Sequence, residues 1–162
     1  MRIGMLAQKQ NLTFATSLRI DQIGMFIMIK QKIFTNGCFD ILHIGHVELL
    51  NYCATLGDVV VGLNSDLSVS RLKGKDRPIN TAQDRKRILL NLRSVSEVIV
   101  FEEDTPLELI KYLRPDVIVK GGDYLSNEVV GSGLAEIRIF KFIDGYSSTS
   151  IIKKISKFPG NN

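Results

Sequence analysis

The regular alternation of short apolar runs with helix-like segments constrains this chain more than any other feature of its sequence. Five runs have the length and composition of strands: Ile33–Thr35, Asp58–Leu63, Glu97–Phe101, Asp116–Lys120 and Glu136–Phe142. Strands that alternate with helices need crossover connections, which favour parallel pairing and right-handed crossovers. The sequence therefore predicts an α/β, Rossmann-like fold: an open, mostly parallel five-stranded sheet with helices on both faces.

Helix signals fall between the strand-like runs. The expected helical segments are Ile44–Leu56, Thr81–Arg93, Thr105–Leu113 and a final segment after Ser150. The segment that starts at Thr81 is expected to bury Ile88, Leu89 and Leu92 on one stripe. The stretch Ser70–Asn80 carries four cations, a Gly and a Pro without any period. We expect this stretch to be a mobile basic loop.

Composition narrows the class of protein. A chain of 162 residues with 44% hydrophobic residues is the size and make-up of one globular domain. The net charge of +4 comes without a dense Lys/Arg run, so no nucleic-acid partner is expected. Two cysteines without Cys-x-x-Cys spacing argue against a disulfide framework or a zinc site, and they fit a cytoplasmic protein. The apolar run Ile23–Lys30 is too short to span a membrane, so no membrane partner is expected either.

The first residues do not follow the alternation. Residues 1–31 are interpreted as an N-terminal extension that is poorly ordered or not native, with a translation start at Met25 or Met28 as the alternative. A secretory signal peptide is not expected, because no small-residue cleavage site follows the apolar run. The folded domain is expected over residues 32–158, and residues 159–162 are interpreted as a tail.

The stretch Thr35–His46 joins the first predicted strand to the first predicted helix. A tight turn between a strand and a helix surrounds a small space with backbone N–H groups and the positive end of the helix dipole. His43 and His46 are three residues apart and share one face of the first helical turn. Gly45 between them lets an anionic group approach the backbone closely. These residue types in this order favour a site for a phosphate undergoing transfer.

Further polar residues follow other strands or begin the last helix. Lys73 in the basic loop is suited to cover phosphates, and Ser148 and Thr149 are suited to hold them at a helix start. The Gly121-Gly122-Asp123 tip follows a predicted strand and is suited to a base or ribose. Solvent exposure of Lys73 and simple helix capping by the hydroxyls are equally good interpretations of the pattern alone. The chain has no Walker lysine motif and no Gly-x-Gly-x-x-Gly, so a P-loop kinase and a dehydrogenase are not supported.

The stretch Asn36–His46, with its His43-Ile44-Gly45-His46 tetrapeptide, resembles the signature of the cytidylyltransferase-like nucleotidyltransferases, which share a HIGH-motif fold. Further stretches resemble one branch of this family, the adenylyltransferase domain of the ADP-heptose synthase enzymes: Val61–Asp66, Arg71–Gly74, Arg77–Asn80, Asp104–Ile110, Leu113–Tyr124 and Val129–Gly131. The resemblance implies an enzyme that converts ATP and D-glycero-β-D-manno-heptose 1-phosphate to ADP-heptose and pyrophosphate.

The resemblance also implies roles for individual residues. It implies catalytic roles for His43, His46 and Lys73. It implies nucleotide contacts for a larger set: Asn36, Gly37, Cys38, Phe39, Gly45, Arg85, Lys120, Gly121, Asp123, Ser147, Ser148 and Thr149. Asp40 and Lys75 are expected to contact the acceptor substrate. No metal site built from protein side chains is expected, and Mg²⁺ is expected as a cofactor that travels with the nucleotide.

Two departures from the heptose branch keep an alternative open. Tyr146 stands where the branch usually has Arg, and Ser148 replaces its first Thr. A cytidylyltransferase that joins CTP to glycerol 3-phosphate, or to another polyol phosphate, is therefore the second interpretation. A non-catalytic nucleotide-binding module is a more distant third. The resemblance is compatible with a homodimer and with a separate heptose kinase in the same pathway.

Overall fold

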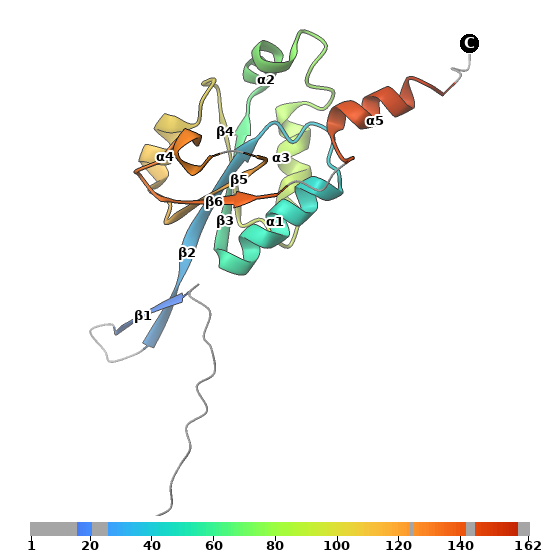
Figure 1. The fold of residues 1–162 in the computed structure, drawn as a ribbon. Helices are drawn as coiled ribbons and strands as arrows, with labels where there is room; N and C mark the ends of the chain where they lie inside the picture. Colours follow the sequence, from blue (N-terminus) through green and yellow to red (C-terminus); the bar gives the residue numbers. More distant parts are fainter. Residues whose placement is uncertain (1–15, 21–25, 124, 142–144, 159–162) are drawn as a thin grey trace, which may run out of the picture.

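The computed structural model describes residues 16–20, 26–123, 125–141 and 145–158. Within these ranges, five parallel strands form the main sheet in the order β4-β3-β2-β5-β6 (Figure 1). The strands are β2 (Phe26–Gly37), β3 (Gly57–Asn64), β4 (Glu97–Phe101), β5 (Val117–Gly121) and β6 (Glu136–Phe140). The predicted open, parallel sheet of five strands is confirmed.

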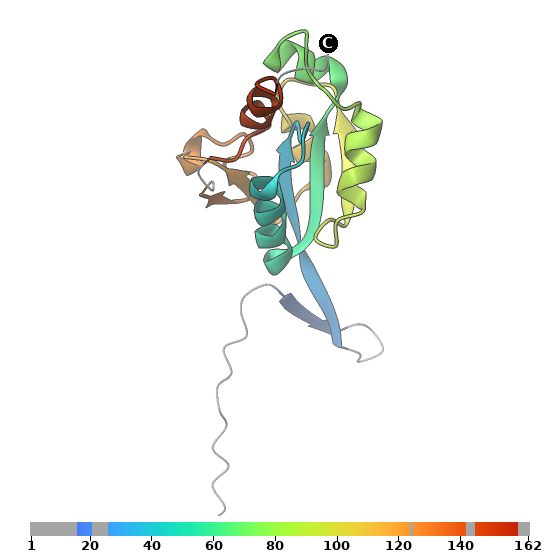
Figure 2. The ribbon, with the colours of Figure 1, turned by 90° about the vertical axis from the view of Figure 1, so that its right-hand side faces the viewer.

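Helices cover both faces of the sheet. They are α1 (Ile44–Leu56), α2 (Asp66–Lys73), α3 (Ala82–Leu90), α4 (Leu107–Leu113) and α5 (Ser148–Ile155), with a 3₁₀ turn η1 (Ser126–Glu128). Alternate side chains of each strand enter two separate cores. Ile33 packs with Leu50 of α1 and Leu89 of α3, whereas Phe34 packs with Ile110 of α4 on the opposite face. Figure 2 looks onto the face that carries α1 and α3.

The order of the strands reverses between β2 and β5. The chain winds outward from β2 through β3 to β4 and then returns to place β5 on the other side of β2. Open parallel sheets bind ligands beyond the carboxyl ends of their strands at such a switch point. At that end the Lys120 Nζ of β5 donates a hydrogen bond to the Asn36 Oδ1 of β2, at 3.2 Å. The fold therefore brings two of the predicted site residues together.

The strand β2 extends well before its predicted start at Ile33. Its first residues, Phe26–Lys30, pair antiparallel with β1 (Thr16–Ile20), and parallel pairing with β3 begins only at Gln31. The β1–β2 arm projects from the body of the domain (Figures 1 and 2). Most of the predicted extension, residues 1–15 and 21–25, and the predicted tail at 159–162 lie outside the described residues. The domain boundary at residue 32 therefore stays a prediction.

The helix α2 was not predicted, and it replaces the first part of the expected basic loop. Ser65 caps it by accepting a hydrogen bond from the Ser68 backbone N–H, and its own Val69 is fully buried. A segment of only eight residues, five of them polar, gives a weak hydrophobic period, so tertiary packing stabilises this helix more than its own sequence does. Lys73 consequently lies at a helix end.

The buried faces of two other segments differ from the prediction. In α3 the side chain of Ile88 is 42% exposed, and the buried stripe consists of Leu89 and the charged Arg85. A helical period places position 85 beside position 89 on the same face, and the partners of Arg85 lie on other elements. The helix α4 begins at Leu107, one residue after the predicted first helical residue Pro106, and the predicted Thr105 cap is replaced by Pro106 without a side-chain cap.

None of the described helices is long and apolar enough to cross a membrane.

Candidate active site

The loop between β2 and α1 is shaped by a strained aromatic residue. Phe39 has a positive φ of 44°, which is uncommon for a bulky side chain and marks a conformation that the surroundings enforce. Its ring is buried and lies against the His46 ring, with 4.9 Å between the centroids. The same turn directs Asp40 inward and starts α1 at Ile44. Phe39, which was predicted to contact the nucleotide, therefore packs its ring against the ring of His46.

The two histidines stack on each other at the start of α1. Their ring centroids are 3.7 Å apart, and the Nδ1 atoms of both rings are buried without a hydrogen-bond partner in the described structure. Burial, together with a smaller effect of the nearby His43, lowers the pKa of His46 to about 4. Burial also lowers the pKa of His43. Both imidazoles are therefore neutral at pH 7, and each offers one N–H donor and one acceptor nitrogen.

Gly45, which lies between the two histidines in the sequence, leaves little room for a side chain. A Cβ at this position would lie 3.2 Å from Nδ1 and Cε1 of His43 and 3.8 Å from the Cβ of Tyr146. Any larger residue here would push on the His43 ring. The sequence-based prediction that a glycine keeps this helix start open is compatible with that geometry.

Cations surround Cys38. Burial raises the pKa of this thiol, while the positive charges of Lys73, Arg85 and Arg77 oppose the rise. Lys120 contributes to the same region: burial lowers its pKa, and the charge of Lys73 lowers it too. Positive charge from α2, α3, β5 and the loop after α2 therefore converges on the turn at the end of β2, which favours an anionic ligand there.

The start of α5 lies beside the start of α1. The Ser148 Oγ donates a hydrogen bond to the backbone carbonyl of Ile41 at 3.1 Å, and Tyr146 lies near Gly45. Ser147 and Ser150 form a reciprocal capping box that begins α5. The structure thus brings the predicted Ser147–Thr149 segment to the predicted histidines, across more than a hundred residues of sequence.

Arg85 makes its contacts inside the protein. The guanidinium group is 1% exposed and donates to the backbone carbonyls of Cys38, Asn64 and Asn80 and to the carboxylate of Asp66. These contacts join the ends of β2 and β3 to the starts of α2 and α3. They give Arg85 a structural role, and its predicted contact with the nucleotide stays a prediction.

Asp40 is also engaged by the protein. Its carboxylate accepts hydrogen bonds from Arg77 Nε and from the backbone amides of Ile79 and Asn80. Burial would raise the pKa of this carboxyl, but the hydrogen bonds from Asn80, Ile79 and Arg77 outweigh it and hold the pKa below its usual value. Sequence reasoning gave no role to Arg77 or Asn80. The only signal for them was the Arg77–Asn80 stretch of the family resemblance.

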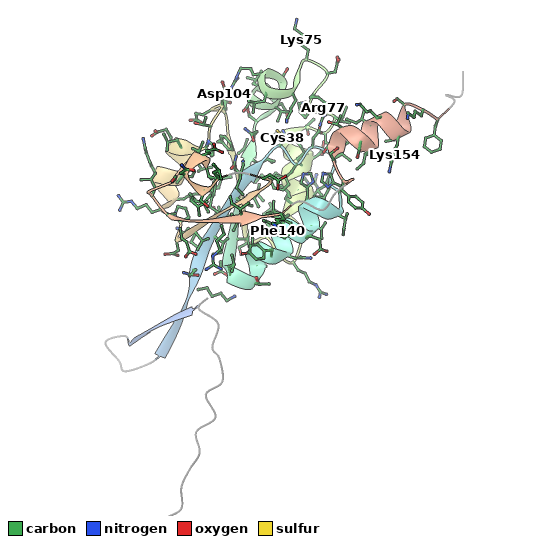
Figure 3. All side chains as sticks on the ribbon, viewed as in Figure 1. Cys38, Lys75, Arg77, Asp104, Phe140 and Lys154 are labelled. Atoms are coloured by element: carbon green, nitrogen blue, oxygen red, sulfur yellow. The ribbon has the colours of Figure 1, made fainter. Side chains whose placement is uncertain are left out.

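Five predicted site residues lie at the surface. Lys75 is exposed at the tip of the loop and points away from Cys38, whereas Arg77 lies on the side toward it (Figure 3). The others with exposed side chains are Lys73, Asp123, Ser147 and Thr149. The structure does not place Lys75 with the histidines, and its contact with an acceptor substrate stays a prediction.

The described residues contain no group of three or more His, Cys, Asp or Glu side chains arranged to hold a metal ion.

The sequence model of the cytidylyltransferase-like family matches residues 34–154, which include every element of the site described above. Among relatives of known sequence, the chain is 56% identical over 128 residues to the bifunctional protein HldE of a Nitratiruptor species, covering 78% of this chain and 28% of that protein. It is 51% identical over 145 residues to the bifunctional protein HldE of Helicobacter hepaticus, covering 85% and 30%. The chain thus spans less than a third of the length of these relatives.

Two solved structures resemble the fold. The crystal structure of the lipopolysaccharide core biosynthesis protein from Thermoplasma volcanium is 26% identical, with a TM-score of 0.56, and the match covers 72% of this chain and 98% of that one. Pantothenate synthetase from Thermus thermophilus is 13% identical, with a TM-score of 0.51, and the match covers 70% and 56%. The second likeness concerns the fold alone.

Proposed function

The chain belongs to the cytidylyltransferase-like family, and on that premise we propose that it is an enzyme that transfers a nucleoside monophosphate from a nucleoside triphosphate to a sugar phosphate. One observation carries the proposal: two stacked, neutral histidines lie at an uncapped helix start, at the switch point of the sheet. The free backbone N–H groups and the positive end of the helix dipole at such a start favour a bound phosphate. Neutral imidazoles can donate hydrogen bonds to its oxygens.

The proposed reaction needs positioning and charge stabilisation more than covalent chemistry. A phosphate oxygen of the sugar phosphate attacks the α-phosphorus of the nucleotide in line. The bond between the α-phosphorus and the bridging oxygen to the β-phosphorus breaks, and its electron pair leaves with pyrophosphate. His43 and His46 donate hydrogen bonds to the phosphates, and Lys73 and Lys120 offset the negative charge that develops. No covalent intermediate on the protein is required.

The proposed nucleotide is ATP and the proposed acceptor is D-glycero-β-D-manno-heptose 1-phosphate, which gives ADP-heptose. Two HldE proteins more than 50% identical over most of this chain support this choice, together with the motifs of the heptose branch. The lipopolysaccharide core biosynthesis protein of similar fold is compatible with a product that feeds a surface glycan. On the basis of the family resemblance, we also propose that a separate heptose kinase acts in the same pathway and that the protein forms a homodimer.

Mg²⁺ is proposed to enter with the nucleotide. Carboxylates and phosphates are its usual ligands, and the nucleotide brings the phosphates. No step of the proposed reaction is assigned to a metal held by protein side chains. A cytoplasmic location is likewise proposed, because both free cysteines, Cys38 and Cys53, fit a reducing compartment.

Tyr146 keeps CTP with glycerol 3-phosphate as the second candidate. This residue lies next to Gly45 and the histidines, at the place where the heptose branch has an arginine. An arginine there would offer several donors to phosphates, whereas a tyrosine offers one hydroxyl. An experiment must therefore distinguish heptose 1-phosphate from glycerol 3-phosphate as the acceptor.

Pyrophosphate release tests these alternatives. The purified protein is incubated with heptose 1-phosphate or glycerol 3-phosphate, each in the presence of ATP or CTP with Mg²⁺. We expect release with ATP and heptose 1-phosphate. Release only with CTP and glycerol 3-phosphate would replace the heptose assignment by the cytidylyltransferase one. Nucleotide binding without release in any combination would instead indicate a binding module.

A further inference from the structure

The loop before the histidines and the loop after Lys73 meet at one buried carboxylate, that of Asp40. Asp40 belongs to the loop that leads to the histidines, and residues 77–80 belong to the loop that follows Lys73. Arg77 Nε donates to Asp40 Oδ2 at 2.6 Å, and the backbone amides of Ile79 and Asn80 donate to Oδ1 at 2.8 and 2.9 Å. The Asn80 side chain returns a hydrogen bond to the carbonyl of Asp40 at 2.8 Å.

These contacts use the whole carboxylate. The side chain of Asp40 is 1% exposed, and both of its oxygens accept hydrogen bonds from the protein. A carboxylate also repels the negative charge of a phosphate at short range. Direct contact between Asp40 and a sugar phosphate would require this network to open and two like charges to approach each other.

The end of the loop is held from a second side. Arg85, buried in α3, donates to the carbonyl of Asn80 at 3.0 Å and to the carbonyl of Cys38 at 2.6 Å. Asn80 is therefore fixed between Asp40 and Arg85, while Cys38 and Asp40 belong to one turn. Asp40 and Arg85 therefore both connect residues 77–80 to the turn that leads to the histidines.

The beginning of the loop connects these anchors to Lys73. The Gly74 N–H bonds to the carbonyl of Ser70 at the end of α2, and the Arg77 N–H bonds to the carbonyl of Gly74. Only the short turn from Gly74 to Arg77 lies between Lys73 and the Asp40 contact. A shift of residues 77–80 would therefore be transmitted to the Lys73 end of α2.

We propose that Asp40 is a positioning residue, which holds the 74–80 loop, and with it Lys73, against the turn that carries His43 and His46. Its role in turnover rests on the proposed function, but the structural role of the carboxylate does not. Asp40 then acts on the reaction through Lys73, without touching the substrates.

The first test is a double-mutant cycle on the rate of pyrophosphate release. Asp40→Asn keeps the shape of the side chain but replaces an acceptor oxygen by a donor group that faces other donors. We expect kcat to fall at least tenfold. In a Lys73→Ala background, the same substitution should lower kcat less than threefold, because the group that it positions is already gone. Equal losses in both backgrounds, or wild-type kcat in Asp40→Asn, would overturn the proposal.

Asp104→Asn is the matched control. Asp104 also pairs with an arginine, Arg71 of α2, but both side chains are at least half exposed. Asp104 lies away from Cys38 (Figure 3). We expect kcat of this variant to stay within twofold of wild type. A loss as large as that of Asp40→Asn would mean that any carboxylate–arginine pair near α2 matters equally, and would contradict a specific role for Asp40.

Hydrogen exchange gives a measurement that does not depend on turnover. In Asp40→Asn the backbone amides of Ile79 and Asn80 should exchange at least tenfold faster, and in Asp104→Asn they should not change. Unchanged exchange at both amides would overturn the proposal even if kcat fell. If the wild-type protein releases no pyrophosphate with any substrate pair, the proposed function fails, while faster exchange still supports the structural role of Asp40.

Arg77→Gln keeps the inference testable if Asp40→Asn does not fold. This variant removes the Arg77 contact and leaves the two amide hydrogen bonds to Asp40 in place. We expect a smaller loss of kcat, about threefold to tenfold, which again disappears in the Lys73→Ala background. Wild-type kcat in Arg77→Gln, or a full additional loss in the double variant, would contradict the proposal.

Discussion

The starts of α1 and α5 face each other across the same loop, and they are built in opposite ways. At the start of α1, His43 makes no side-chain capping hydrogen bond, and the Nδ1 atoms of both histidines have no partner in the described structure. At the start of α5, Ser147 and Ser150 satisfy each other in a capping box. The α1 helix buries four residues, whereas α5 buries none and projects from the body of the domain (Figure 1).

This difference separates two roles that helix starts have in a site. A helix start without a side-chain cap leaves backbone N–H groups that a ligand can satisfy. At the start of α5, by contrast, the capping box already satisfies backbone N–H groups that a ligand would otherwise bind. The hydrogen bond from Ser148 to Ile41 fixes the position of this helix start. We therefore interpret the α1 start as the part that acts on phosphates and the α5 start as a wall of the site that Ser148 holds in place.

The largest expected effect comes from His46→Ala at the start of α1. Loss of one preorganised donor to a transition-state phosphate should lower kcat by about 10²–10³-fold, by analogy with oxyanion-hole donors. The rate of pyrophosphate release measures this loss, and circular dichroism checks that the fold is kept. Asn51→Ala, at an exposed position of the same helix, serves as the control and should keep kcat within twofold. A wild-type rate in His46→Ala would assign the chemistry to another part of the site.

The second effect is a loss of stability in acid that also belongs to α1. The pKa of His46 is about 4 in the folded protein and about 6.5 in an unfolded chain. As the pH falls below 6.5 the unfolded chain binds the proton first, so the free energy of unfolding decreases until the pH reaches about 4. This single group should account for about 3 kcal/mol of that decrease. The lowered pKa of His43 acts in the same direction.

Urea unfolding between pH 7 and pH 4 measures this slope. His46→Gln should lose most of the slope, whereas Ser147→Ala should keep it, because α5 contains no histidine. An equal slope in wild type and His46→Gln would show that the imidazole of His46 is as easily protonated in the folded protein as in the unfolded chain.

The smallest expected effect concerns the anchor of α5. Ser148→Ala removes the hydrogen bond from Ser148 Oγ to the Ile41 carbonyl, which is a loss of about 1 kcal/mol. We expect the KM for the nucleotide to rise about fivefold with little change in kcat. Ser156→Ala, at the other end of the helix, removes a similar local hydrogen bond and should leave KM unchanged. A large fall in kcat in Ser148→Ala would mean that the α5 start contributes to the chemistry, and would contradict the contrast with α1.

Local patterns predicted most of the fold. The run Asp58–Leu63 is apolar and β-branched enough to be recognised as a buried strand. The helix expected to start at Thr81 forms, with the Thr81 side chain as its cap. The helix α2 escaped prediction because Ser65 and the buried Val69 stabilise it through contacts that a short segment does not reveal. Ile88 was assigned to the core because an apolar residue is the default choice, whereas the structure places Arg85 there among four acceptors on other segments.

The sequence by itself determined the strand–helix alternation, the HIGH-type motif and the family, because these depend on residue types at short spacings. Only the tertiary structure decided what the charged residues in and around that motif contact. The family resemblance implied ligand contacts for Asp40 and Arg85, yet their partners in the structure lie 19 to 47 residues away along the chain, apart from Asn80 near Arg85. Hydrogen-bond partners of a buried charge are chosen by the packing of distant segments. No local pattern reports whether a buried charge is already satisfied within the protein.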